Sequence, residues 1–255
     1  MLKAATRAGL PSLIQEQNSH AGITNKWLSK GASKICVAYP GMESQFPAEK
    51  IVYTGNPVRS DLIGVSENKH AGLAHFKLDE QKTTLLVLGG SLGAARVNQL
   101  IMDNLGLFDK LGIQLIWQCG KGYYESYRQY DSTSVRVVAF IDRMDLAYSV
   151  ADLIISRSGA LSVSELCLVG KPVIFIPSPN VAEDHQTKNA KSIAEQGGAI
   201  LIPESELEAQ FAQKLGSLLS DAGGMKALGK KIKALSRPNA TSDIVDEVVK
   251  LLPTE

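Results

Sequence analysis

The sequence predicts an α/β protein built on parallel β-sheet. Short apolar runs alternate with amphipathic segments of helical period along its 255 residues, and strands buried on both faces are typical of parallel sheets covered by helices. Two of the apolar runs end in small residues and open directly into a helix, at residues 83–101 and 153–168. This arrangement indicates doubly wound, Rossmann-like units.

Strands are expected where short apolar runs stand between turn-forming residues, at residues 12–15, 34–38, 51–54, 84–88, 114–118, 135–139, 153–156, 173–176 and 199–202. Helices are expected where apolar residues recur every three or four positions, at residues 23–30, 92–105, 122–130, 144–150, 160–168, 184–196, 204–219, 223–233 and 242–252. Pro238 ends the helical region before the last of these helices.

A break near residues 56–61 separates two groups of elements, because Asn56-Pro57 favours an extended or turn conformation. We expect a partial N-terminal domain at residues 1–60, a complete C-terminal domain at residues 61–237 and a closing helix at residues 238–255. The first group has only three strands and is expected to be the end of a domain whose beginning is absent. Because its sheet has an exposed edge, we expect another protein surface to cover it, such as a second copy of the chain.

Composition narrows the class of protein. The net charge is +1 with no basic block, so nothing favours nucleic acid as a partner. No apolar run is long enough to span a bilayer, and the basic first residues lack the apolar region of a secretory signal. Cys36, Cys119 and Cys167 are expected to be reduced core residues, and the histidines form no metal-ligand spacing with them. The composition therefore favours a cytoplasmic protein without a metal or cofactor.

The segment 152–165 carries the most information about function. Ser158 and Gly159 separate an apolar run from a helix that starts at Ala160. Unpaired N–H groups at a helix start, with the positive end of the helix dipole, suit a phosphate. Glu165 follows about two turns into the helix, where a carboxylate can take the two hydroxyls of a ribose. The segment therefore predicts a nucleotide site.

A second strand, turn and helix lie upstream, where the turn is the glycine-rich segment 89–94. Glycines allow the backbone to approach a ligand closely, and Ser91 offers a hydroxyl to a phosphate oxygen. Such turns also occur for packing reasons alone, so this copy by itself leaves both interpretations open. Two copies in one domain favour the ligand.

Six ordered motifs carry a resemblance to a known family. They are QEQNSHAGITNK at 15–26, GNPVR at 55–59, GGSLGA at 89–94, FIDRM at 140–144, RSGALSVSE at 157–165 and DHQTKNA at 184–190. Together they resemble the MurG family, the bacterial N-acetylglucosaminyltransferases of peptidoglycan synthesis. The resemblance runs from near residue 1 to the last helix.

The resemblance implies the GT-B fold, in which two Rossmann-like domains face each other across a cleft. It implies that the C-terminal domain binds UDP-GlcNAc and that the acceptor is lipid I. The reaction would be inverting transfer of GlcNAc to form lipid II, without a metal, by a protein peripheral to the cytoplasmic face of the inner membrane. The last helix would then pack back on the N-terminal domain.

The chain departs from the family pattern in one large respect. The family begins with a glycine-rich loop that carries a histidine, and with about half of the N-terminal domain, and these have no counterpart here. The catalytic base is therefore unknown, and this chain alone is expected to transfer no GlcNAc. A smaller departure is Gln15, where many members have histidine.

The resemblance also implies roles for single residues in donor binding. Arg59 would face the pyrophosphate, Ser91 would contact the same phosphates, and the backbone of Ile141 would read the uracil edge. Helix-start amides and the ribose carboxylate would come from Ala160, Leu161, Ser162, Val163, Ser164 and Glu165. Gln186 and Asn18 would contact the sugar. Three further residues lie outside this set. Phe140 is expected to pack against its neighbours, and Arg157 is expected to help bind the pyrophosphate. His185 is not expected to act as a catalytic base.

Three other classes of protein compete with this interpretation. A nicotinamide dehydrogenase needs an acidic residue at the end of the strand after its glycine-rich turn, and here that strand ends in Gln118-Cys119-Gly120. A non-catalytic UDP-sugar-binding remnant remains open, as does a UDP-sugar epimerase of similar fold.

Overall fold

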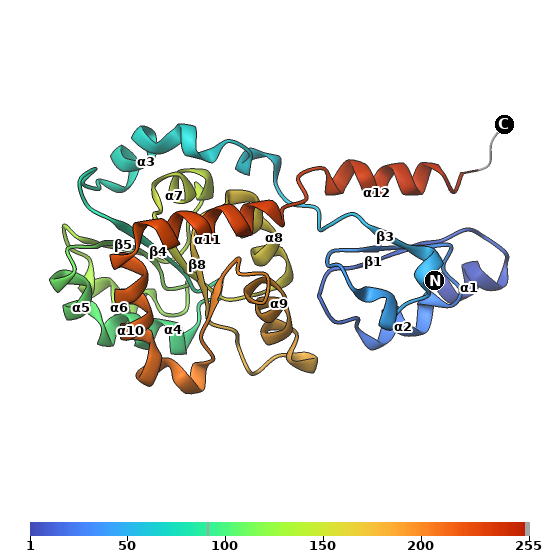
Figure 1. Cartoon of the computed structure of the whole chain (residues 1–255), viewed down its shortest axis with the longest axis horizontal. Helices are drawn as coiled ribbons and strands as arrows, with labels where there is room; N and C mark the ends of the chain where they lie inside the picture. The colour runs from blue at the N-terminus through green and yellow to red at the C-terminus, as the bar shows by residue number, and fades with distance from the viewer. Residues whose placement is uncertain (91, 253–255) are drawn as a thin grey trace.

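The computed structural model describes residues 1–90 and 92–252, and these form two parallel sheets in two lobes (Figure 1). The small lobe has the strand order β1-β2-β3, from β1 (Leu13–Glu16), β2 (Lys34–Val37) and β3 (Ile51–Tyr53). Helices α1 (Leu2–Arg7) and α2 (Ile23–Ser29) belong to it. Its core is a compact apolar cluster around Ile14, Ile35 and Phe46.

The large lobe has six parallel strands in the order β6-β5-β4-β7-β8-β9. They are β4 (Thr84–Leu88), β5 (Gln114–Gln118), β6 (Val135–Val138), β7 (Leu153–Ser156), β8 (Val173–Phe175) and β9 (Ile200–Leu201). The chain first extends the sheet from β4 to β6, and then starts again on the other side of β4 with β7. This reversal confirms the predicted doubly wound, α/β class.

Helices cover both faces of the large sheet. They are α3 (Lys69–Phe76), α4 (Ala95–Asp103), α5 (Leu105–Lys110), α6 (Tyr124–Tyr127), α7 (Met144–Val150), α8 (Ala160–Val169), α9 (His185–Ala194), α10 (Leu207–Ser220) and α11 (Ala222–Ala234). Alternate residues of each strand pack into two separate cores, with Leu86 and Ile154 on one face of the sheet and Leu85 and Ile155 on the other. Both faces are therefore apolar, which explains the unbroken apolar runs in the sequence.

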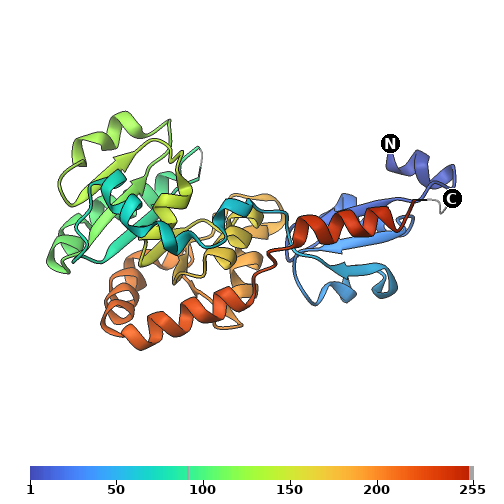
Figure 2. The same ribbon diagram turned by 90° about the horizontal axis from the view of Figure 1, so that it is seen from above.

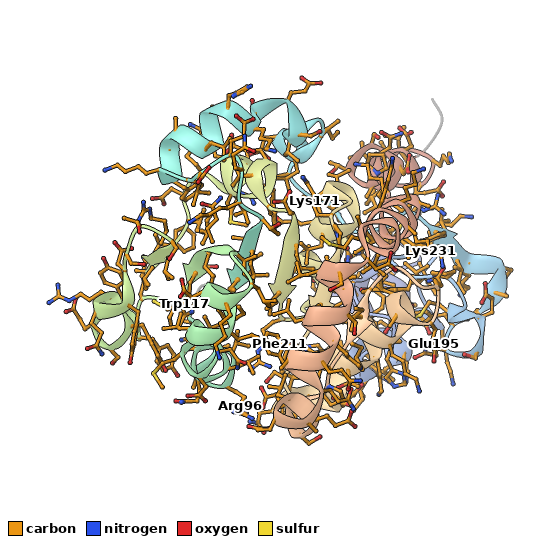
Figure 3. All side chains as sticks on the ribbon, turned by 60° about the vertical axis from the view of Figure 1, so that its left-hand side comes forward. Arg96, Trp117, Lys171, Glu195, Phe211 and Lys231 are labelled. Atoms are coloured by element: carbon orange, nitrogen blue, oxygen red, sulfur yellow. The ribbon has the colours of Figure 1, made fainter. Side chains whose placement is uncertain are left out.

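Trp117 and Phe211 mark one of these two cores (Figure 3). Phe211 of α10 packs edge-to-face on Phe108, with ring centroids 6.4 Å apart. The indole N–H of Trp117 donates to Asn98 Oδ1 at 2.9 Å, so the largest buried side chain leaves no polar atom unpaired. Cys36, Cys119 and Cys167 are buried free thiols, as predicted.

The strands lie within two residues of their predicted bounds, but several helices differ. One helix was predicted over 92–105, whereas α4 begins at Ala95 and a separate α5 follows Asn104. Gly93 has φ +80°, which a helix does not allow, and the Asn104 side chain bonds back to Leu100 O. Helices α1 and α3 were not predicted, because neither shows a clear apolar repeat.

The chain passes between the lobes twice, at residues 54–59 and 235–239. Arg237 lies over the ring of Tyr53, with the guanidinium carbon 3.8 Å from the ring centroid. Gly55 has φ +88°, and a Cβ there would lie 2.4 Å from Arg237 Cβ, so the first passage needs glycine. The closing helix α12 (Ala240–Val249) then lies over the small-lobe sheet (Figure 2).

Candidate functional site

The candidate site lies at the carboxyl ends of β4 and β7, where the strand order of the large sheet reverses. Loops that leave neighbouring parallel strands in opposite directions open a crevice at such a point. Here the crevice consists of two adjoining hollows, of about 330 Å³ and 590 Å³, which share Gly90, Arg157 and Ser162. The motifs at 55–59, 89–94, 140–144, 157–165 and 184–190 each contribute residues to one or both of them.

The first hollow is lined by the ends of β4, β5 and β7 and by several segments around them. Ile141 and Phe140 come from the loop between β6 and α7, Tyr148 comes from α7, Glu165 from α8, and Arg59 from the first passage between the lobes. The Ile141 side chain is buried, as expected. Phe140 was expected to be a packing residue, and this was wrong: the residue is 45% exposed at the rim of the hollow. Its neighbour Asp142 is exposed too, and both residues border the hollow.

Glu165 is held by two partners. Arg59 Nε lies 3.3 Å from Glu165 Oε1, and the Tyr148 hydroxyl donates to Oε2 at 3.3 Å. The carboxylate is about one-fifth exposed, whereas the arginine is about half exposed. Residues that lie 106 positions apart in the sequence therefore meet in one charged group at the edge of the hollow.

The second hollow lies beside the glycine-rich turn and the starts of α8 and α9. Gly93 and Gly120 bring the loops after β4 and β5 into backbone contact. A Cβ on Gly93 would lie 2.2 Å from Cys119 O, and one on Gly120 would lie 2.3 Å from Gly93 Cα. The glycines thus have a packing reason, and the same turn also borders the hollow. Ser91, the predicted phosphate ligand in this turn, lies outside the described residues.

The start of α8 faces both hollows through Ser162. The first four N–H groups of a helix have no partner within it, and in α8 these belong to Gly159, Ala160, Leu161 and Ser162. The prediction also included Val163, but its N–H donates to Gly159 O at 2.9 Å and its side chain is buried in the core. The donors available to a ligand are therefore those of residues 159–162, which include the predicted Ala160, Leu161 and Ser162.

Two further predicted residues lie around the second hollow and are fixed by hydrogen bonds. Gln186 Oε1 accepts from the Ser178 backbone N–H at 3.0 Å, which leaves its amide nitrogen as a donor. Arg157 bonds Ile176 O at 3.0 Å and pairs with Glu204 at 2.5 Å. Both partners of this pair are largely buried, so Arg157 is already neutralised and acts first as an anchor of the turn.

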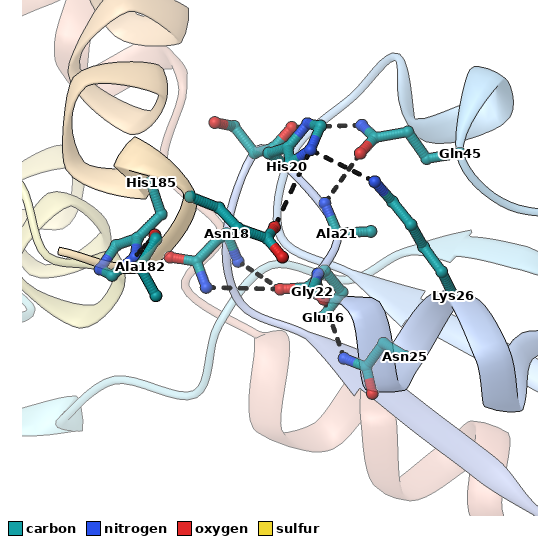
Figure 4. A network of polar contacts seen from close by, with 12 residues as sticks. Glu16, Asn18, His20, Ala21, Gly22, Asn25, Lys26, Gln45, Ala182 and His185 are labelled. Carbon is teal, nitrogen blue, oxygen red and sulfur yellow. Dashed lines mark hydrogen bonds and ion pairs between the residues drawn. The ribbon is translucent and has the colours of Figure 1, made fainter.

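Asn18 lies outside the linings of both hollows. Its side chain accepts from Asn189 Nδ2 at 3.0 Å, and its backbone N–H donates to the buried Glu16. Figure 4 shows Glu16 at the centre of this network, where it also accepts from Gly22 N and Asn25 Nδ2. The carboxylate therefore fixes the loop that follows β1. His185, at the start of α9, forms a hydrogen bond with Ala182 O through its Nδ1 at 2.8 Å.

Sequence reasoning missed the two asparagines that join the lobes. Asn189 is fully buried and bonds Asn18, Ser19 N at 2.8 Å and Ser158 O at 3.3 Å. Asn56 donates to Gln17 O and to the hydroxyl of Ser164, both at 3.0 Å. Thus Ser164, predicted as part of the phosphate turn, links α8 to the first passage instead. Asn56 stands in a quoted motif, but nothing local indicates its partner.

Residues 1–90 and 92–252 contain no group of three or more His, Cys, Asp or Glu side chains placed to hold a metal ion. None of their helices is both long enough and apolar enough to cross a membrane.

A large and a small parallel lobe beside a crevice at the switch point define the fold as that of a GT-B glycosyltransferase. The glycosyltransferase family 28 C-terminal domain matches residues 84–244. The crystal structure of MurG from Acinetobacter baumannii superposes with a TM-score of 0.79 at 32% identity, over 98% of this chain and 69% of that one.

A sequence relative extends the match beyond this domain. The UDP-N-acetylglucosamine--N-acetylmuramyl-(pentapeptide) pyrophosphoryl-undecaprenol N-acetylglucosamine transferase of Flavobacterium psychrophilum is 55% identical, over 100% of this chain and 70% of its own length. The chain belongs to the MurG family of glycosyltransferases. A UDP-GlcNAc 2-epimerase from Neisseria meningitidis has a TM-score of 0.67 at 14% identity and shares the fold alone.

Proposed function

We propose that the chain binds UDP-GlcNAc as the sugar donor of a transferase that makes lipid II. The observation that carries the proposal is the pair of adjoining hollows at the switch point, which share Gly90, Arg157 and Ser162. An elongated donor with a nucleoside at one end and a sugar at the other fits two hollows joined in this way. The names of the sequence relatives support the choice of donor and reaction.

The first hollow suits the uridine. The Ile141 loop presents backbone groups to a base, and Glu165 offers two oxygens to the ribose hydroxyls. The amides at the start of α8 and the Arg59 guanidinium then suit the diphosphate, since both favour the charge that develops on departing UDP. Gln186 borders the second hollow, and its amide nitrogen has no partner within the described residues, which suits a hydroxyl of the GlcNAc ring.

The remaining parts of the proposal concern the acceptor. This chain spans 70% of the length of the Flavobacterium relative. Inverting transfer of GlcNAc to lipid I at the cytoplasmic face of the membrane is therefore proposed for a protein of that full length. The domain limits at residues 60 and 237 and a role for Asn18 at the sugar are part of the same proposal.

A second copy of the chain is proposed to cover the edge of the small sheet at β1. Light scattering tests this proposal, and a clean monomer contradicts it.

Calorimetric titration with UDP-GlcNAc tests donor binding. We expect saturable binding to this chain, and about tenfold weaker UDP binding by Glu165→Ala, which loses a charged hydrogen-bond acceptor. The matched control is Glu125→Ala, because Glu125 also pairs with an arginine, Arg128, but on the exposed surface of α6. Unchanged UDP affinity of Glu165→Ala contradicts the ribose assignment.

Turnover separates the candidate activities. We expect that this chain transfers no GlcNAc to a lipid I analogue although it binds the donor, and formation of lipid II would contradict this expectation. Conversion of UDP-GlcNAc to another UDP-sugar without any acceptor would favour the epimerase.

A further inference from the structure

Tyr148 has an unusual place for a core residue. It is 1% exposed within the apolar cluster between the sheet and α3, α7 and α8, yet its hydroxyl reaches the first hollow and donates to Glu165 Oε2 at 3.3 Å. Burial, followed by the charge of Glu165 and the hydrogen bond to it, raises the pKa of Tyr148 well above its usual value. The hydroxyl therefore keeps its proton and acts as a donor.

The helix that contains Tyr148, α7, directly follows the Ile141 loop, which is proposed to face the uracil base. Ile141 stands three residues before the start of α7, and Tyr148 lies in its second turn. The first turn is fixed by Arg143, which donates to both carboxylate oxygens of Asp145 at 2.9 and 2.7 Å. One short rigid helix therefore sets the distance between the backbone that faces the base and the hydroxyl that touches Glu165.

A bound nucleotide would affect the two partners of Glu165, Arg59 and Tyr148, differently. Arg59 is half exposed on the connector between the lobes, and a diphosphate competes for its guanidinium. Tyr148 is enclosed and has no access to the diphosphate. When Arg59 turns to the phosphates, the tyrosine hydroxyl remains as the protein donor that orients the carboxylate.

We propose that Tyr148 is a positioning residue for nucleotide recognition, which holds Glu165 so that its oxygens meet the 2′ and 3′ hydroxyls of the ribose. This inference rests on the proposed function, because it assigns Glu165 to the ribose. It predicts that Tyr148 acts on the discrimination between a ribose diol and a ribose without hydroxyls, and not on the affinity for nucleotides in general.

The test compares UDP with 2′,3′-dideoxyuridine diphosphate, titrated into the full chain by calorimetry. In Tyr148→Phe we expect the affinity for UDP to fall about tenfold, as for a lost hydrogen bond to a charged group, and the affinity for the dideoxy compound to stay unchanged. The ratio of the two dissociation constants therefore moves toward one, as it does in Glu165→Gln.

Tyr39→Phe is the matched control. It also removes one buried tyrosine hydroxyl, and within the described residues that hydroxyl has no hydrogen-bond partner. We expect it to keep the ratio of the native chain. A Tyr148→Phe variant that also keeps this ratio overturns the inference while donor binding stands. A native chain that binds both compounds equally overturns the inference and the ribose assignment together.

Discussion

Arg59 and Glu165 form an ion pair, with Nε 3.3 Å from Oε1, that joins the first passage between the lobes to the second turn of α8. In the proposed complex the two residues serve different parts of one ligand. The guanidinium meets the diphosphate and the carboxylate meets the ribose, so a nucleotide with both groups exchanges one ion pair for two ligand contacts.

Replacing Arg59 tests this exchange. We expect Arg59→Met to weaken UDP binding at least about tenfold, since it removes a charge-assisted contact to phosphate. Uridine, which has no phosphate, keeps its affinity or binds more tightly, because the carboxylate no longer has a competing partner. Calorimetry with the two ligands measures both effects, and Arg128→Met is the surface control. An equal loss for uridine and UDP contradicts the exchange.

Asn189 tests the contact between the lobes. Its side chain makes three hydrogen bonds in a fully buried position, to Ser19 N, Asn18 Oδ1 and Ser158 O. Asn189→Ala leaves these groups unpaired, and we expect it to lower the free energy of unfolding by roughly 2 to 3 kcal/mol. Denaturant unfolding measures this against Asn239→Ala, in which the replaced side chain is exposed and makes no cap hydrogen bond. Equal stability of the two variants is the contrary result.

Gly93 tests whether the glycine-rich turn is required by the fold itself. Its φ is +80° and a Cβ would lie 2.2 Å from Cys119 O, so Gly93→Ala strains the backbone and separates two loops. We expect a loss of about 2 kcal/mol or more in unfolding free energy. Gly106→Ala is the control, because it lies in α5 with open space around it, and is expected to stabilise by about 0.5 kcal/mol. A Gly93→Ala protein as stable as the native chain refutes the packing role.

The sequence predicted the strands well for a physical reason. A parallel strand that is buried on both faces is apolar along most of its length, so segments such as 153–155 and 115–117 are visible without any tertiary information. The topological reversal follows from the order of those strands, and with it the place of the crevice. The helix ends were less visible, because Asn104 and Gly93 act through local hydrogen bonding and a positive φ.

The contacts within the site were only partly predictable. Arg59 and Glu165 were both named as ligand residues, yet their pairing spans 106 positions and no pattern of spacing encodes it. From the sequence alone, Tyr148 is indistinguishable from an ordinary core residue of α7. The sequence likewise predicts Arg157 as a phosphate ligand, because it does not show that Glu204 lies beside it. The partners depend on how the loops meet in space, which a linear pattern does not contain.

The hollows are bordered mainly by loops and helix starts that follow the carboxyl ends of parallel strands, whereas the sheet beneath them is covered by two apolar cores. Such an arrangement separates the evolution of ligand choice from that of the scaffold. Under the proposed function, a change in the loop at Phe140 or in the turn at Ser178 alters which sugar nucleotide is accepted while the strands keep their packing, so specificity can change in small steps without loss of the scaffold.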